Sequence, residues 1–172
     1  SLTSGPLARE LELTKRIMDQ LGGKVPVLPT IFSPMHAAEW MTGGSDHPEY
    51  LRAFMQYDPQ EVHKGLEILT EANLRFLEEL LKIGVDGIFL ADIFASKDDL
   101  SREAHDEFVK KYDLQILNAC KDKTWFNILH AHGWKDLRFE EYEAAGYPVQ
   151  AYNWEDCFRG GDPGDTQRVT SL

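Results

Sequence analysis

The sequence predicts an α/β protein with about four parallel strands joined by crossover helices. Short apolar runs alternate with longer segments of helical periodicity, and Gly or Pro residues separate them. Polar side chains follow the apolar runs at the points where strands are expected to end. Since functional groups of parallel α/β folds collect at the carboxyl ends of the strands, we expect a site there.

The first half of the chain predicts one strand and several helices. A helix is expected over residues 7–21, where apolar side chains recur at helical spacing before Gly22-Gly23. Residues 25–32 are typical of a strand that ends at Ser33-Pro34. Two short helices over residues 35–41 and 48–54 follow. A long helix is then predicted from the capping pair Asp58-Pro59 to residue 83, where Gly84 ends it.

The second half predicts the remaining three strands. Residues 87–92 form a short apolar run that ends in Asp92, and Ser101 is expected to cap the helix that follows. Residues 125–132 are predicted to form the third strand. A short helix over residues 139–145 and a fourth strand over residues 148–156 complete the pattern.

The length of 172 residues predicts a single domain over residues 1–172. A closed eight-stranded barrel typically needs about 250 residues. The chain therefore corresponds either to part of such a (β/α)8 TIM barrel or to an open sheet. Because a partial barrel or open sheet exposes two strand edges, which proteins normally cover, we expect a homo-oligomer.

The composition limits the classes of partner. The chain has 29 acidic and 18 basic residues, a formal net charge of −11, which argues against nucleic acid or an anionic membrane surface. A local pocket for an acidic small molecule remains compatible with this charge. Cys120 and Cys157 are isolated, and no apolar run is long enough to span a bilayer. These features predict a cytoplasmic protein.

The most informative motif is the apolar run that ends in His130-Ala131-His132. Because side chains alternate along a strand, His130 and His132 are predicted to point to the same side. Two neighbouring imidazoles at a strand end can bind a metal, an acidic ligand or a developing anion. They can also form a hydrogen-bonded pair under a loop.

Other polar residues are candidates for the same edge of the sheet. Asp92 is either a site residue or an anchor for the loop after its strand. Ser33 ends the first strand, and Asn153 is expected to be a buried amide bonded to a ligand or to a neighbouring strand. Glu155 and Asp156 are interpreted chiefly as loop charges. His36 and His105 are expected to be surface histidines, and Met41 is expected to fill the core.

The order of several motifs is similar to that of the uroporphyrinogen decarboxylase superfamily. The resemblance runs from Val25-Pro26-Val27 to Tyr152-Asn153-Trp154. Between these ends it includes Ser33-Pro34, Trp40-Met41, Gly43-Gly44, Gly84-Val85-Asp86 and Leu100-Ser101. This superfamily has a (β/α)8 barrel and contains haem-pathway decarboxylases as well as cobalamin-dependent methyltransferases.

The decarboxylase resemblance implies a small acidic ligand such as a tetrapyrrole, and it implies no cofactor. Asp92, His130 and His132 would then take part in proton transfer. Substrate contacts would come from Ser33, Trp40 and Asn153. Trp40 stands where the decarboxylases have a catalytic tyrosine, and an indole cannot supply a phenol.

The methyltransferase resemblance implies zinc instead. That branch carries His-x-Cys on a strand, and His132 stands in the place of the cysteine. His130 and His132 could still bind zinc if a third ligand came from Asp92, Asn153 or Glu155, or from a part of the barrel beyond this chain. A third interpretation is a non-catalytic half-barrel that binds a ligand or assembles with a partner.

Overall fold

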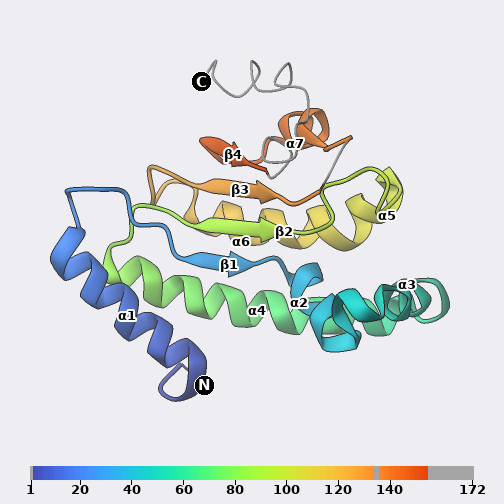
Figure 1. The fold of residues 1–172 in the computed structure, drawn as a ribbon, viewed down its shortest axis with the longest axis horizontal. Helices are drawn as coiled ribbons and strands as arrows, with labels where there is room; N and C mark the ends of the chain where they lie inside the picture. Colours follow the sequence, from blue (N-terminus) through green and yellow to red (C-terminus); the bar gives the residue numbers. More distant parts are fainter. Residues whose placement is uncertain (1, 134–135, 155–172) are drawn as a thin grey trace.

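Helices and strands alternate in the computed structural model, which describes residues 2–133 and 136–154 (Figure 1). The first half contains α1 (Gly5–Leu21), β1 (Thr30–Phe32), α2 (Pro34–Thr42), a 3-10 turn (Gly44–Asp46), α3 (Pro48–Tyr57) and α4 (Pro59–Ile83). The second half contains β2 (Phe89–Asp92), α5 (Arg102–His105), a π-helical turn (Asp106–Lys110), α6 (Lys111–Cys120), β3 (Ile128–Ala131), α7 (Phe139–Ala145) and β4 (Ala151–Asn153).

The four strands form one parallel sheet in the order β1-β2-β3-β4, which confirms the predicted fold class. Each pair of neighbouring strands is joined by a connection that contains at least one helix, as parallel pairing requires. Among the described helices, none is long and apolar enough to cross a membrane.

The first strand is shorter than the expected residues 25–32 because prolines interrupt its hydrogen-bond ladder. Pro26 and Pro29 have no N–H to donate, so regular pairing begins only at Thr30. Before that point, Val27 donates its N–H to Asp86 Oδ2 at 2.9 Å, and the Pro29 carbonyl accepts from Phe89 N–H at 3.0 Å. Residues 25–29 therefore follow the sheet through isolated bonds.

The sheet has two faces that differ in their covering. Ile31, Leu90 and Leu129 are paired across β1, β2 and β3, and all three are buried in the larger hydrophobic core. We call this side the helix face, because it packs on α4 and α6 through Leu77, Leu80, Ile116 and Leu117. The opposite side, the cavity face, carries the alternating residues Phe32, Phe89, Ala91 and His130.

A second core holds α2 and α3 on α4 at the carboxyl ends of the strands. It contains Met35, Leu51, Leu66 and Tyr112, with Phe94 from the loop after β2. Met41, which we expected as core filler, is 76% exposed and borders a surface groove with Leu51 and Leu66. This second core fixes the two short helices beside the cavity face (Figure 1).

Candidate functional site

A cavity of about 700 Å³ lies on the cavity face at the carboxyl ends of the strands. Its floor comes from β1, β2 and β3, and its walls come from α2, α3 and the loops after β2 and β3. Its lining includes aromatic, charged and histidine side chains together with one alanine: Phe32, His36, Glu39, Trp40, Arg52, Phe89, Ala91, Asp99, His130 and His132. The cavity thus has the position that the parallel strands predicted.

His130 and His132 both line this cavity, which confirms that they point to the same side. Their ring centroids are 5.8 Å apart. His130 stacks on Phe89 at 5.3 Å, and its Nδ1 lies 2.6 Å from Asn153 Oδ1. Since an amide oxygen only accepts hydrogen bonds, this contact assigns a proton to Nδ1 and fixes the orientation of the ring.

Asn153 forms a hydrogen bond with His130, but it is not buried as we expected. We predicted a buried amide, whereas Asn153 is exposed at the end of β4. Its amide oxygen orients His130 across the β3–β4 pair. Glu155 and Asp156 lie outside the described residues.

Asp92 lies on the helix face and not among the residues that line the cavity. It is paired with Ala131, while Ala91 is paired with His130, so alternation turns the carboxylate away from the imidazole. Asp92 is completely buried; its Oδ1 accepts from Phe94 N–H at 2.8 Å and its Oδ2 from the Tyr142 hydroxyl at 2.8 Å. These contacts agree with the interpretation of Asp92 as an anchor for the loop after its strand. They do not place its carboxylate where it could transfer a proton to a ligand in the cavity.

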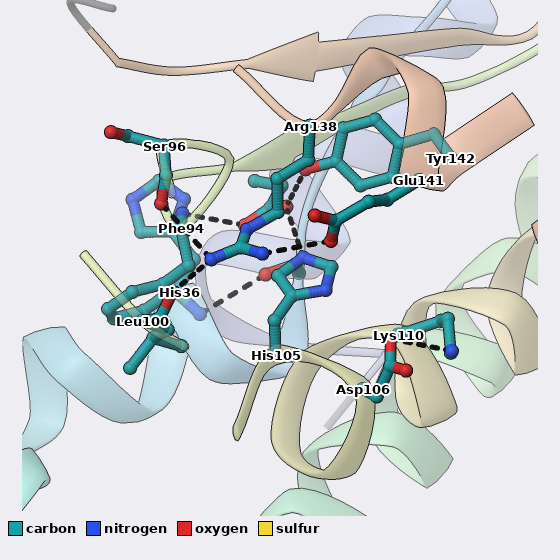
Figure 2. Close-up of polar contacts among 12 residues, drawn as sticks. His36, Phe94, Ser96, Leu100, His105, Asp106, Lys110, Arg138, Glu141 and Tyr142 are labelled. Atoms are coloured by element: carbon teal, nitrogen blue, oxygen red, sulfur yellow. Dashed lines mark hydrogen bonds and ion pairs between the residues drawn. The ribbon is translucent and has the colours of Figure 1, made fainter. Parts of the chain in front are cut away.

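Buried polar groups surround Asp92 on the helix face. His105 was expected to face solvent, yet it is 1% exposed, and its Nε2 lies 3.8 Å from Asp92 Oδ2 (Figure 2). Burial raises the pKa of Asp92 most strongly, but His105, the Phe94 N–H and the Tyr142 hydroxyl together hold that pKa below its usual value. Burial, reinforced by the charge of Asp92, raises the pKa of Asp113 well above its usual value.

Ser33 is a helix cap. The predicted substrate contact is replaced by a capping bond, in which Ser33 Oγ accepts from His36 N–H at 3.2 Å at the start of α2. Ser33 is completely buried and is not among the cavity-lining residues, because Pro34 begins the helix immediately after it. Its role is to position α2.

Trp40 lines the cavity as expected and is 56% exposed. It contacts His36 and Phe32, with ring centroids 4.4 Å and 4.7 Å away. His36 was expected at the surface, but it is only 5% exposed. The i, i+4 spacing of His36 and Trp40 on a helix was the sequence signal that could have placed both on the cavity side.

The charges in the lining are mixed. Within the described part of the chain, Arg52 on α3 is the one lysine or arginine that lines the cavity. Burial raises the pKa of Glu39 and that of Asp99, and the charge of Arg52 partly opposes both shifts. Two carboxylates, Glu39 and Asp99, and one guanidinium, Arg52, therefore border the cavity.

The loops after β2 and β3 are tied together beside the cavity. Arg138 is 1% exposed and donates to the carbonyls of Ser96 and Leu100 and to Glu141 Oε2, the last at 2.9 Å (Figure 2). Lys97 N–H also donates to the Asp136 carbonyl at 3.0 Å. These bonds hold the wall that carries Phe94 and Asp99.

The residues present do not complete a zinc site. Within residues 2–133 and 136–154, no three histidine, cysteine, aspartate or glutamate side chains are grouped as a metal ion requires. His130 and His132 supply two donors, but Asp92 lies on the opposite face and Asn153 is bonded to His130. His130 and His132 alone therefore do not form a complete zinc site in this part of the chain.

Comparison with known proteins identifies relatives that are about twice as long. A family model described as uroporphyrinogen decarboxylase (URO-D) matches residues 3–165. Uroporphyrinogen decarboxylase from Hydrogenobaculum sp. is 27% identical over 157 residues, which cover 90% of this chain and 44% of the relative. The same enzyme from Geobacter sp. is 23% identical over 146 residues, covering 84% of this chain and 42% of the relative.

A solved structure shares the fold. A methyltransferase from Methanosarcina mazei superposes with a TM-score of 0.76 at 20% identity, over 99% of this chain and 47% of that chain. The chain thus spans less than half the length of these proteins, and its four parallel strands correspond to part of a TIM-barrel-like fold.

Proposed function

Because the chain belongs to the uroporphyrinogen decarboxylase family, we propose that its cavity binds a flat, acidic ligand such as a tetrapyrrole carboxylate. The single observation that carries this proposal is the lining of the 700 Å³ cavity. Aromatic side chains of Phe32, Trp40 and Phe89 offer surfaces for a flat ring system. The Arg52 guanidinium offers a partner for a carboxylate.

We further propose that the reaction is a decarboxylation. Loss of CO2 leaves an electron pair on carbon, and that carbon must take up a proton. His130 and His132 are the groups that we assign to this proton transfer, and Asn153 orients His130. Asp92 is assigned a positioning role, since it anchors the loop that carries Phe94.

Fluorescence titration with uroporphyrin I tests the binding step. The expected result is saturable quenching of tryptophan fluorescence, and the part of it that Trp40 contributes from the cavity lining is lost in Trp40→Phe. Trp125→Phe is the matched control, because Trp125 is 61% exposed and bonded through Nε1 to Asp86, away from the cavity. Absence of saturable binding, or equal loss in both variants, would contradict the proposal.

Turnover is measured separately as CO2 released from a porphyrinogen. His130→Ala and His132→Ala are each expected to abolish release while quenching by uroporphyrin I persists. Binding without any turnover by the parent chain would favour the non-catalytic binding module instead.

Zinc-dependent methyl transfer is a second candidate. His130 and His132, whose rings are 5.8 Å apart, would supply two of its zinc ligands, and it requires a further ligand that residues 2–133 and 136–154 do not provide. Metal analysis of purified chain tests it: stoichiometric zinc that is lost in His132→Ala would support this candidate over decarboxylation.

We also propose that the chain forms a homo-oligomer in the cytoplasm. Within the described residues, β1 and β4 each pair on one side only, so both edges of the sheet have unpaired backbone groups. Sedimentation of the chain as a stable monomer would contradict the homo-oligomer.

A further inference from the structure

The tautomer of His36 is fixed by the backbone of the neighbouring strand. His36 Nδ1 lies 3.1 Å from the Ala91 carbonyl oxygen, which also accepts from Ser33 N–H at 3.0 Å. A carbonyl oxygen cannot donate, so the proton of this contact must be on Nδ1. A neutral His36 therefore carries an unprotonated Nε2.

The surroundings keep His36 neutral. Burial lowers its pKa most strongly, while the Ala91 carbonyl and the charge of Asp92 act in the opposite direction. His130 on β3 and His132 in the loop directly after it add to the lowering. Phe32 and Trp40 contact the ring at 4.9 Å and 4.4 Å between centroids, and they hold it in place.

The acceptor nitrogen is directed away from the strand. Nδ1 is bound to the Ala91 carbonyl, so Nε2 projects from the other side of a ring that lines the cavity. In the described part of the chain, no side chain or backbone group donates to Nε2. A held, neutral imidazole of this kind accepts one hydrogen bond and rejects a second acceptor.

We propose that His36 Nε2 is a specificity determinant that accepts a hydrogen bond from a ring N–H of the bound ligand. This inference rests on the proposed function, since the pyrrole rings of a tetrapyrrole present such N–H groups. It adds a requirement that aromatic stacking and carboxylate pairing do not impose. If the ligand had a ring oxygen in place of the N–H, a lone pair of that oxygen would face the lone pair of His36 Nε2, and the two would repel.

Two variants separate this role from a structural one. In His36→Asn, the amide nitrogen can retain the bond to Ala91, but the acceptor at the Nε2 position is removed. In His36→Gln, the longer side chain loses that backbone bond and can place an amide oxygen near the Nε2 position. The proposal predicts that Asn weakens the binding of pyrrole-2-carboxylate about three- to tenfold and that Gln weakens it less. A structural role predicts the reverse order, and that order would overturn the proposal.

A matched pair of small probes makes the test independent of tetrapyrrole binding. Pyrrole-2-carboxylate and furan-2-carboxylate differ in the ring N–H and oxygen, and both carry one carboxylate. The 172-residue chain is expected to bind the pyrrole about three- to tenfold more tightly, as followed by NMR shifts, and His36→Asn should remove this preference. An absent preference, or one that persists in His36→Asn, would overturn the proposal.

Nitrogen NMR of the parent chain with 15N-labelled histidine rings measures the tautomer of His36 directly, without any substitution. The expected spectrum at neutral pH shows His36 with a protonated Nδ1 and an unprotonated Nε2, and the Nε2 resonance shifts when pyrrole-2-carboxylate is added. The opposite tautomer, or an imidazolium, would overturn the inference. If uroporphyrin I fails to bind while the small-probe and tautomer results hold, only the proposed tetrapyrrole function is refuted.

Discussion

Replacing Tyr142 by Phe removes one hydroxyl from the helix face and tests the anchoring of Asp92. Tyr142 is 1% exposed, and its hydroxyl donates to Asp92 Oδ2 at 2.8 Å. A hydrogen bond to a charged group contributes about 1.5–3 kcal/mol. The variant leaves the carboxylate buried with the Phe94 N–H and with His105 at 3.8 Å. We expect the free energy of unfolding to fall by about 2 kcal/mol. For a chain of this length that loss lowers Tm by about 4–8 °C.

Tyr147→Phe is the matched control for this change. Tyr147 is also buried and packs on Tyr142 at 4.8 Å between ring centroids, but its hydroxyl has no hydrogen-bond partner in the described structure. Removing that hydroxyl should therefore leave the free energy of unfolding unchanged or slightly raised. Urea unfolding followed by far-UV circular dichroism measures both variants. An equal loss in the two would refute the assigned hydrogen bond.

The pH dependence gives a second check on the same bond. The pKa of Asp92 is lower in the folded chain than its usual 3.8, so its contribution to stability is present above pH 3.8. That contribution is lost as the pH falls below 3.8 through the folded value. Since Tyr142 helps to lower this pKa, the difference between the parent chain and Tyr142→Phe should shrink in that window. A difference that stays constant would contradict the assignment.

Three further predictions concern other parts of the described chain. Asp113 has a raised pKa and no hydrogen-bond partner for either oxygen, so its contribution to stability declines as the pH rises from 3.8 through the folded pKa. Asp113→Asn should thus become more stable relative to the parent chain as the pH rises above 3.8 toward the raised pKa of Asp113, measured by urea midpoints; a pH-independent difference would contradict this. Arg52→Gln should weaken uroporphyrin I binding up to about fivefold at low salt and less at high salt, while Arg16→Gln on α1 should not. Gly87→Ala should destabilise the fold strongly, because its Cβ would lie 1.7 Å from the Phe126 carbonyl oxygen, whereas Gly65→Ala in α4 meets no atom within 4 Å and should raise Tm.

The order of elements could be predicted because each boundary has a local chemical signal. Residues 139–145 and the stop at Gly146 match α7, and Gly84 ends α4 in a left-handed conformation with φ of 89°. The first strand was predicted too long, since the missing N–H groups of Pro26 and Pro29 affect pairing with a partner strand that lies far away in sequence.

The candidate site was predicted only in part because strand ends do not reveal register. The shared side of His130 and His132 follows from their spacing within one strand. The relation of Asp92 to His130 depends on the β2–β3 register, in which Ala91 and not Asp92 stands beside that histidine. The i, i+4 spacing of His36 and Trp40 indicated only that the two share a side of the helix, whereas the burial of His36 depends on the Ala91 carbonyl, which is 55 residues away in the sequence.

The alternation of side chains along β2 and β3 has a consequence for engineering. Positions 89, 91, 130 and 132 border the cavity, while positions 90, 92, 129 and 131 pack beneath the sheet. Substitutions at positions 89, 130 and 132 thus change the cavity lining, whereas those at positions 90, 92, 129 and 131 change the packed interior. Inserting one residue into either strand would exchange the two sets and carry a buried carboxylate or a pair of imidazoles to the wrong side.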